Sequence, residues 1–175
     1  MLSRPKTNSF KASRPIADRF PWSTLVVATL AFWLSGSFVL DFVIMPCLYW
    51  TGMMVEPGFA TAGYSIFGVF NHLEVMCAAI ALTGLLVLRI TQSANFGGRR
   101  GVFLGMVVLA IALIDTYTLA PTMSALGLNL NAFGTTEVPA LMNQMHVEYW
   151  ALELVKLFSI AVLIRFCLTS ADQKG

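Results

Sequence analysis

The chain has 175 residues, of which 57% are hydrophobic and 11% are charged, and its formal net charge is +2. A soluble domain of this length carries about 25% charged residues, so the composition excludes an ordinary soluble protein and predicts an integral membrane protein of one domain. Cys47, Cys77 and Cys167 lie far apart and form no CxxC motif, which argues against a disulfide framework or a zinc site.

The first element along the chain is a polar, basic segment over residues 1–20, which contains two prolines and several serines. It is typical of a flexible cytoplasmic tail, and a transit peptide is an alternative because such peptides are rich in Arg and Ser. We expect the membrane domain to cover residues 21–169 and a second short tail to cover 170–175.

Four apolar runs follow the tail, and each is long enough to cross the hydrocarbon core, which takes about 20 residues. They predict helices over 22–49, 64–89, 101–120 and 138–168. The connection after the third run, "PTMSALGLNLNAFGTTEVP", is the longest, and its "TTEVP" is typical of a helix start with Thr135 or Thr136 as the cap. The fold class is therefore predicted to be all-α, an integral membrane four-helix bundle.

The positions of Lys and Arg predict the orientation of this bundle. All of them except Lys156 fall in the N-terminal tail, in or beside the second connection, or at the C-terminal end. The first and third connections hold no Lys or Arg at all. We therefore expect both termini to face the cytoplasm, an N-in/C-in topology.

Ionisable residues inside the apolar runs need a reason, because each costs about 2.5–3.5 kcal/mol on insertion scales. Counting along each helix from its cytoplasmic end places four of them at a common depth of roughly 22–29 Å. These four are Asp41, His72, Asp115 and His146. Carboxylate and imidazole groups at one level are a candidate metal site or a proton relay.

Helical geometry assigns faces to these groups, because His and Glu of an H-x-E motif point about 200° apart. Small residues at Ser65 and Gly68 share the side of His72, so we expect His72 to face the bundle and Glu74 to face elsewhere. In the fourth helix, Glu153 and Lys156 are three residues apart and are predicted to form an intramembrane ion pair.

A shift of the sequence by 74 residues superposes Asp41 on Asp115, His72 on His146 and Glu74 on Glu148. This spacing suggests two related helical hairpins about an axis along the membrane normal.

Three functions remain open for the polar layer, of which the first is the expected one and the other two are alternatives. In the first, it only fixes helix packing, in a non-enzymatic accessory or scaffold protein that needs no cofactor and that joins a larger membrane complex or a homo-oligomer. In the second, a cation- or proton-binding transporter-like protein uses Asp41, His72, Asp115 and His146. In the third, His72 and His146 are the axial ligands of a b-type haem or another tetrapyrrole. The sequence shows no nucleic-acid-binding patch, and the lipid bilayer is the expected partner.

Several motifs resemble a family of small membrane proteins called domain of unknown function 4149, which is related to the human transmembrane protein 205. The motifs are "WLSGS" followed by "VIMP", then "PGFATAGYSIF" and "MNQMH", and the resemblance covers residues 22–168. It is strongest to cyanobacterial members, which implies a plasma (inner) or thylakoid membrane. The resemblance implies a four-helix membrane bundle, no established reaction and no catalytic residues.

Overall fold

The computed structural model describes residues 21–53, 58–91, 98–133 and 140–172. The expected N-terminal tail and the Thr135 or Thr136 cap lie outside these residues. Every secondary-structure element within them is helical. In chain order the elements are α1 (Trp22–Val39), η2 (Leu40–Ile44), α2 (Met45–Trp50), α3 (Phe59–Thr91), α4 (Gly98–Ile114), η4 (Asp115–Leu119), α5 (Ala120–Phe133) and α6 (Ala140–Asp172).

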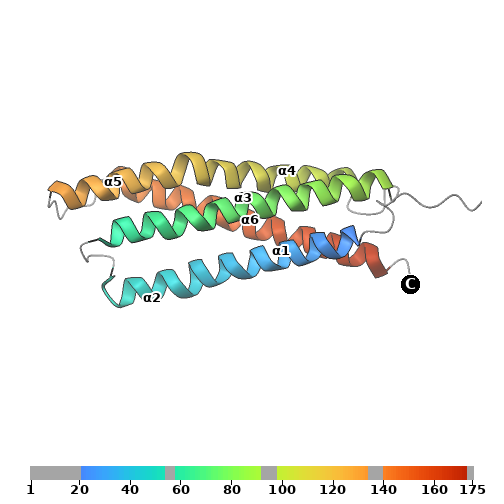
Figure 1. Cartoon of the computed structure of the whole chain (residues 1–175), viewed down its shortest axis with the longest axis horizontal. Coiled ribbons are helices and arrows are strands. Elements are labelled where there is room, and N and C mark those ends of the chain that lie inside the picture. The colour runs from blue at the N-terminus through green and yellow to red at the C-terminus, as the bar shows by residue number, and fades with distance from the viewer. Residues whose placement is uncertain (1–20, 54–57, 92–97, 134–139, 173–175) are drawn as a thin grey trace, which may run out of the picture.

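These elements form four long helical segments that lie side by side (Figure 1). The α1–α2 segment packs against α3 and α6, and the α4–α5 segment also packs against α3 and α6. The four segments therefore surround a common interior, and each runs opposite to the segment before it.

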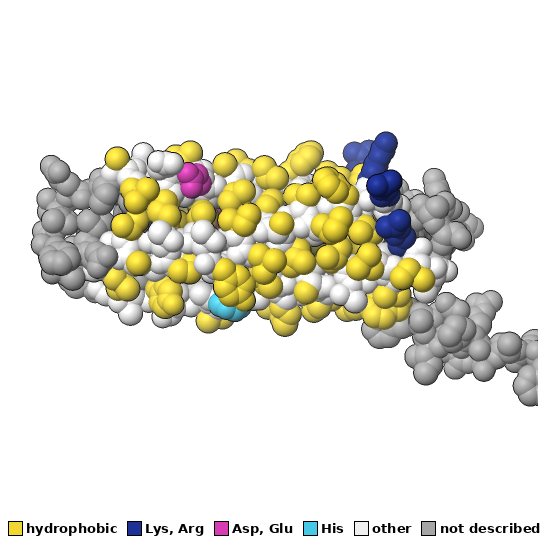
Figure 2. Space-filling view, turned by 90° about the horizontal axis from the view of Figure 1, so that it is seen from above, with side chains coloured by type: hydrophobic (Ala, Val, Ile, Leu, Met, Phe, Trp, Pro, Cys, Tyr) yellow, Lys and Arg dark blue, Asp and Glu magenta, His cyan; other side chains and the backbone are white. Residues whose placement is uncertain are grey.

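The start of α1, the end of α3, the start of α4 and the end of α6 lie at one end of the molecule (Figure 1). Four arginines belong to these parts of the helices, and we call this the basic end: Arg89, Arg99, Arg100 and Arg165. Figure 2 shows Lys and Arg side chains gathered at one end of a surface that is otherwise largely apolar.

Three of the segments are long and apolar enough to cross a membrane: Trp22–Trp50, Thr61–Thr91 and Gly98–Leu128. This confirms the prediction of membrane-length apolar helices for three of the four runs. The outer surfaces of the helices also expose large apolar side chains, such as Phe32, Phe103 and Phe158. An apolar exterior of this extent suits contact with lipid.

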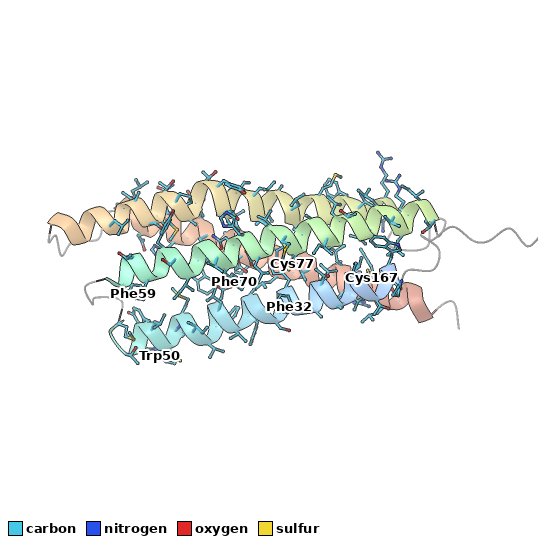
Figure 3. All side chains as sticks on the ribbon, viewed as in Figure 1. Phe32, Trp50, Phe59, Phe70, Cys77 and Cys167 are labelled. Atoms are coloured by element: carbon cyan, nitrogen blue, oxygen red, sulfur yellow. The ribbon has the colours of Figure 1, made fainter. Side chains whose placement is uncertain are left out.

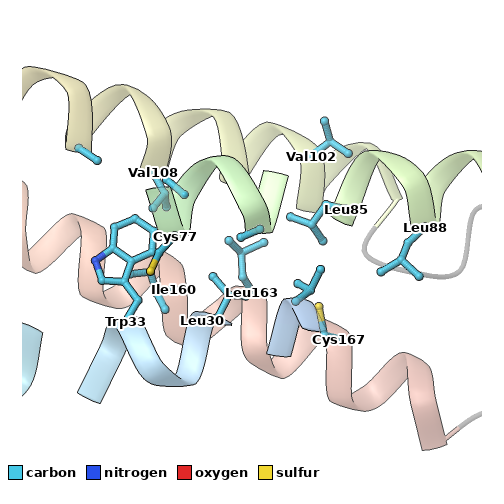
Figure 4. Packing of buried hydrophobic residues seen from close by; sticks show 14 residues of the cluster. Leu30, Trp33, Cys77, Leu85, Leu88, Val102, Val108, Ile160, Leu163 and Cys167 are labelled. Atoms are coloured by element: carbon cyan, nitrogen blue, oxygen red, sulfur yellow. The ribbon is translucent and has the colours of Figure 1, made fainter. Parts of the chain in front are cut away.

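Buried apolar side chains fill the half of the interior nearer the basic end. Leu30, Leu85, Ile160 and Leu163 come from three different segments and are each at most 2% exposed (Figure 4). Trp50 and Phe59 mark the opposite end of the molecule, and Cys167 lies near the basic end (Figure 3). The interior beyond this apolar core, toward Trp50 and Phe59, holds the polar groups.

The first and third segments each contain one π-helical turn, η2 and η4, shortly before a proline. Pro46 and Pro121 lack a backbone N–H, and their rings clash with the carbonyl group four residues earlier in a regular helix. The wider π turn relieves this conflict. The third segment therefore continues through Pro121 to Phe133, although the sequence places the end of this helix at residue 120 and a connection after it.

Close packing of α1 on α3 depends on Gly84, because a β-carbon at this position would overlap the side chain of Val26. We expect Gly84→Ala to lower the free energy of unfolding by about 1–3 kcal/mol, as overpacking does. The measurement is thermal unfolding of the purified protein in mild detergent, followed by circular dichroism.

Gly68→Ala is the matched control, since Gly68 lies in the same helix and a β-carbon there would meet no atom within 4 Å. It should leave the stability unchanged or raise it. Val26→Ala should restore part of the stability lost in Gly84→Ala. Equal stability of the Gly84→Ala and Gly68→Ala variants would contradict the packing described here.

Candidate functional site

The side chain of Lys156 lies at the centre of a buried cluster of carboxyl groups. Its ammonium nitrogen Nζ donates a hydrogen bond of 2.7 Å to Glu74 Oε2. The same nitrogen lies 2.5 Å from Glu153 Oε2 and 3.7 Å from Asp115 Oδ2. Lys156 therefore connects α6 with α3 and η4. We call Lys156, Glu74, Asp115, Glu153 and Asp41 the acidic cluster.

Glu74 has the most hydrogen bonds in the acidic cluster. Its Oε1 accepts bonds from Trp33 Nε1 at 2.8 Å and from Ser37 Oγ at 2.9 Å, in addition to the bond from Lys156 to its Oε2. Three donors around one carboxylate stabilise its charged form. Glu74 is therefore the natural counter-ion of Lys156.

Asp41 extends the acidic cluster toward the end of the bundle opposite the basic end. Its Oδ1 accepts a long bond of 3.4 Å from the Tyr149 hydroxyl group. This bond links η2 to α6.

All five members of the acidic cluster are at most 2% exposed. If every group were ionised, four carboxylates and one ammonium would give a charge of −3 in an apolar interior. Burial of unpaired charge costs far more than protonation of the group that carries it. Lys156 can balance only one of these charges, so the acidic cluster holds an excess of carboxyl groups over cations.

Several oxygens of the acidic cluster accept no hydrogen bond from the described residues. These are both carboxyl oxygens of Asp115 and both of Glu153. Glu153 Oε2 and Asp115 Oδ2 instead face the Lys156 ammonium group in ion pairs, the second at the longer distance of 3.7 Å. Among the described residues, Glu153 Oε1 and Asp115 Oδ1 have neither kind of contact, and a buried acceptor of this kind costs free energy.

The two aspartates are positioned by the π-helical turns. Asp41 is the second residue of η2, and Asp115 is the first residue of η4. A π turn changes the direction of the side chains that follow it and is frequent at functional sites. Asp41 and Asp115, which are 74 residues apart in the sequence, therefore lie in the same kind of local structure, a π-helical turn. The other carboxylate pair differs, because Glu74 is buried and Glu148 is exposed.

A cavity of about 110 Å³ reaches the acidic cluster from the half of the bundle that is farther from the basic end. It lies between α2, α3, α5 and α6, and Asp41 forms part of its wall. Asn71, Ser124, His146 and Tyr149 supply its other polar groups. Asp41 is therefore the member of the acidic cluster that borders this cavity.

The two histidines do not join the acidic cluster. His72 is exposed, with Nδ1 2.6 Å from the carbonyl oxygen of Gly68 and its ring against Tyr117. His146 is also exposed and lines the cavity. Of the four residues predicted to share one layer, the structure brings Asp41 and Asp115 into the interior and leaves His72 outside. Within the described residues, no three His, Cys, Asp or Glu side chains are placed to hold a metal ion.

The predicted faces of α3 are wrong, because Glu74 points inward and His72 points outward. The small residues that guided the prediction lie on an outer face, where Ser65 is exposed. A better signal is the regular spacing of three and four residues along α3. It links the buried residues Asn71, Glu74, Ala78, Ala81, Leu85 and Leu88. An apolar stripe with this spacing marks the buried side of a helix, and Glu74 belongs to it.

Comparisons of this chain with protein-family models, with curated proteins and with solved structures find no match. The site is therefore interpreted from its own geometry.

Removal of the central ammonium group tests the energetic role of the acidic cluster. Lys156→Met leaves the Glu74 carboxylate without its counter-ion, so we expect a loss of about 3–5 kcal/mol in the free energy of unfolding. Lys156→Met combined with Glu74→Gln should recover a large part of this loss, because the uncompensated charge is then gone. Chemical unfolding in mild detergent measures both variants.

The double-mutant cycle isolates the coupling between the two residues. Glu148→Gln is the control, since Glu148 is exposed and only accepts a bond of 2.9 Å from Gln144. Additive effects of Lys156→Met and Glu74→Gln would show that the pair is not the centre of the cluster.

Proposed function

We propose that the chain is a membrane protein with four spans whose acidic cluster binds and releases protons through the cavity beside Asp41. The observation that carries the proposal is the excess of buried carboxyl groups over cations in the described residues. Lys156 contacts three carboxyl groups, those of Glu74, Asp115 and Glu153, and Asp41 is a fourth buried carboxyl group of the cluster. The proposed class is a non-enzymatic, proton-coupled, transporter-like protein.

The number of spans depends on α6, which has 33 residues but is less uniformly apolar than the other segments. Its ionisable residues Glu153 and Lys156 are buried in the interior, where they contact each other, so they do not face lipid. Arg165 lies at the basic end, where a water interface is expected. These positions support α6 as a fourth span. The positive-inside rule then supports a cytoplasmic basic end and cytoplasmic termini.

Access to the acidic cluster is supported from one side. The cavity borders Asp41, whereas the buried apolar side chains of Leu30, Leu85, Ile160 and Leu163 fill the interior between the cluster and the basic end. A closely packed core that is mainly apolar is a barrier to protons. The proposed protein therefore loads its protons from the cavity side and does not act as an open proton channel in this conformation.

The positions of the carboxyl groups give an order for proton entry. A proton that enters the cavity first meets Asp41, and the carboxyl groups that contact Lys156 lie farther inward. Ionisable residues in series are how membrane proteins pass protons inward. A change in the number of bound protons alters the charge around Lys156, which links α6 to α3 and η4, so protonation is coupled to helix packing.

The geometry favours proton binding over the other two hypotheses. An accessory protein that needs only helix packing has no use for surplus carboxyl acceptors. Haem ligation by two histidines requires both rings to face one pocket, whereas His72 is not part of the cavity wall that contains His146. We also propose that the chain belongs to the domain of unknown function 4149 family and that it lies in a plasma or thylakoid membrane.

A membrane-permeant carbodiimide tests the proposal, because it reacts with a carboxyl group that carries a proton. We expect labelling at Asp41, the member of the acidic cluster beside the cavity, at neutral pH, with a yield that falls as the pH is raised. Peptide mass spectrometry of the protein in proteoliposomes locates the label.

Asp41→Asn should abolish labelling at this site, and Glu148→Gln should leave it unchanged. Protein that carries no label at Asp41, or a label whose yield does not depend on pH, would contradict proton binding at this residue.

A further inference from the structure

A groove on the outer surface lies between α4 and α6 at the basic end. It has a volume of about 550 Å³ and is lined by Arg99, Arg100, Phe103, Leu104, Val162 and Phe166. Four of these six side chains are apolar, and the two arginines lie together at the start of α4. The groove is separate from the acidic cluster and shares no residue with the cavity beside Asp41.

Among the residues that the structure describes, no negative charge compensates the arginines of this groove. Every ion pair formed within the described residues involves Lys156, so neither Arg99 nor Arg100 pairs with a described carboxylate. Both are exposed. They also occupy the first turn of α4, which holds no acidic residue.

The position of Arg99 and Arg100 at the start of α4 makes the binding of an anion more favourable. The start of a helix carries partial positive charge from its unpaired backbone N–H groups. Two arginines in this turn add to that charge, where acidic side chains are usually preferred. A bound phosphate group would balance both contributions, and guanidinium groups match its oxygen atoms in geometry.

The apolar wall extends from the arginines along the bundle. Phe103 is 61% exposed, and it lies one helical turn beyond Arg99 and Arg100 on α4. Val162 and Phe166 of α6 form the facing wall. A ligand that fills the groove therefore needs a negatively charged group at the basic end and an apolar chain directed toward the middle of the bundle.

We propose that this groove binds one anionic phospholipid, with its phosphate on Arg99 and Arg100 and an acyl chain against Phe103, Val162 and Phe166. Pockets with basic residues between membrane helices on the cytoplasmic side are suited to such headgroups. The site rests on the proposed insertion in a membrane and is independent of proton binding at the acidic cluster.

The test measures melting temperatures of the full chain in mild detergent during titration with phosphatidylglycerol. Phosphatidylcholine with the same acyl chains is titrated in parallel. We expect phosphatidylglycerol to raise the melting temperature and to bind at least about tenfold more tightly than phosphatidylcholine, because the choline cation of phosphatidylcholine balances the charge of its own phosphate. Glycerol 3-phosphate, which has no acyl chain, should produce no shift.

Two variants separate the parts of the site. The double variant Arg99→Gln, Arg100→Gln should reduce the affinity for phosphatidylglycerol to that for phosphatidylcholine. Val162→Trp should fill the groove and weaken both lipids. Arg89→Gln is the matched control, since Arg89 is exposed at the same end but does not line the groove.

Equal loss of phosphatidylglycerol binding in Arg89→Gln and in the double variant would overturn the proposal in favour of general attraction to the basic end. Equal affinity of the unaltered protein for the two lipids would overturn it as well. Labelling of Asp41 by carbodiimide is expected to be the same in all these variants, so failure of the lipid site is distinguishable from failure of the proposed proton site.

Discussion

The hydrogen-bonded ion pair between Lys156 and Glu74 is the interaction on which the polar interior depends. It joins α6 to α3 at a distance of 2.7 Å, and Trp33 and Ser37 of α1 complete the bonds of Glu74. One carboxylate thus connects three of the four helical segments. Removal of either charge would leave the other buried without compensation, which is far more costly than the pair itself. The remaining carboxyl groups gather around a cation that is already neutralised.

This arrangement divides the interior into two halves with different properties. Toward the basic end, apolar side chains such as Leu30 and Leu163 form a closely packed core. Toward the other end, a cavity borders Asp41. The acidic cluster lies at the boundary between these halves. The cavity borders it on one side, and closely packed side chains border it on the other. One-sided access of this kind suits a group that is loaded and unloaded in turn, and does not suit a continuous pore.

The sequence predicts the helices better than it predicts the site. Length and hydropathy are sufficient for the apolar segments, because any spanning helix must satisfy its backbone internally. Helix rotation is harder to predict, since a membrane helix is apolar on every side and the difference between faces is small. For α3 the small residues Ser65 and Gly68 indicate the wrong face, so Glu74 is not predicted as a partner of Lys156. The contact of Lys156 with Glu153 in the same helix is predicted and is present. The π turns at Asp41 and Asp115 also rotate the residues that follow, and no simple periodicity predicts them.

The depth in the membrane that is counted along each predicted helix is nevertheless informative. It places Asp41 and Asp115 at a common level, and both belong to the acidic cluster. The sequence does not predict the contact at the centre of this cluster, because Glu74 and Lys156 are separated by 82 residues. Contact between helices depends on rotation and on packing at positions such as Gly84, where the side chain of Val26 occupies the space of a β-carbon. The site thus arises from the packing of four segments and not from any local motif.

Infrared difference spectroscopy of the protein in lipid, recorded across a pH change, tests the central claim most directly. Protonated carboxyl groups have a carbonyl stretching band that is separate from the bands of carboxylates. Proton binding at the acidic cluster predicts such a band at neutral pH, its loss at high pH, and its reduction in Asp41→Asn but not in Glu148→Gln. A spectrum without protonated carboxyl groups at neutral pH would contradict proton storage in the acidic cluster and would favour a cluster that serves helix packing alone.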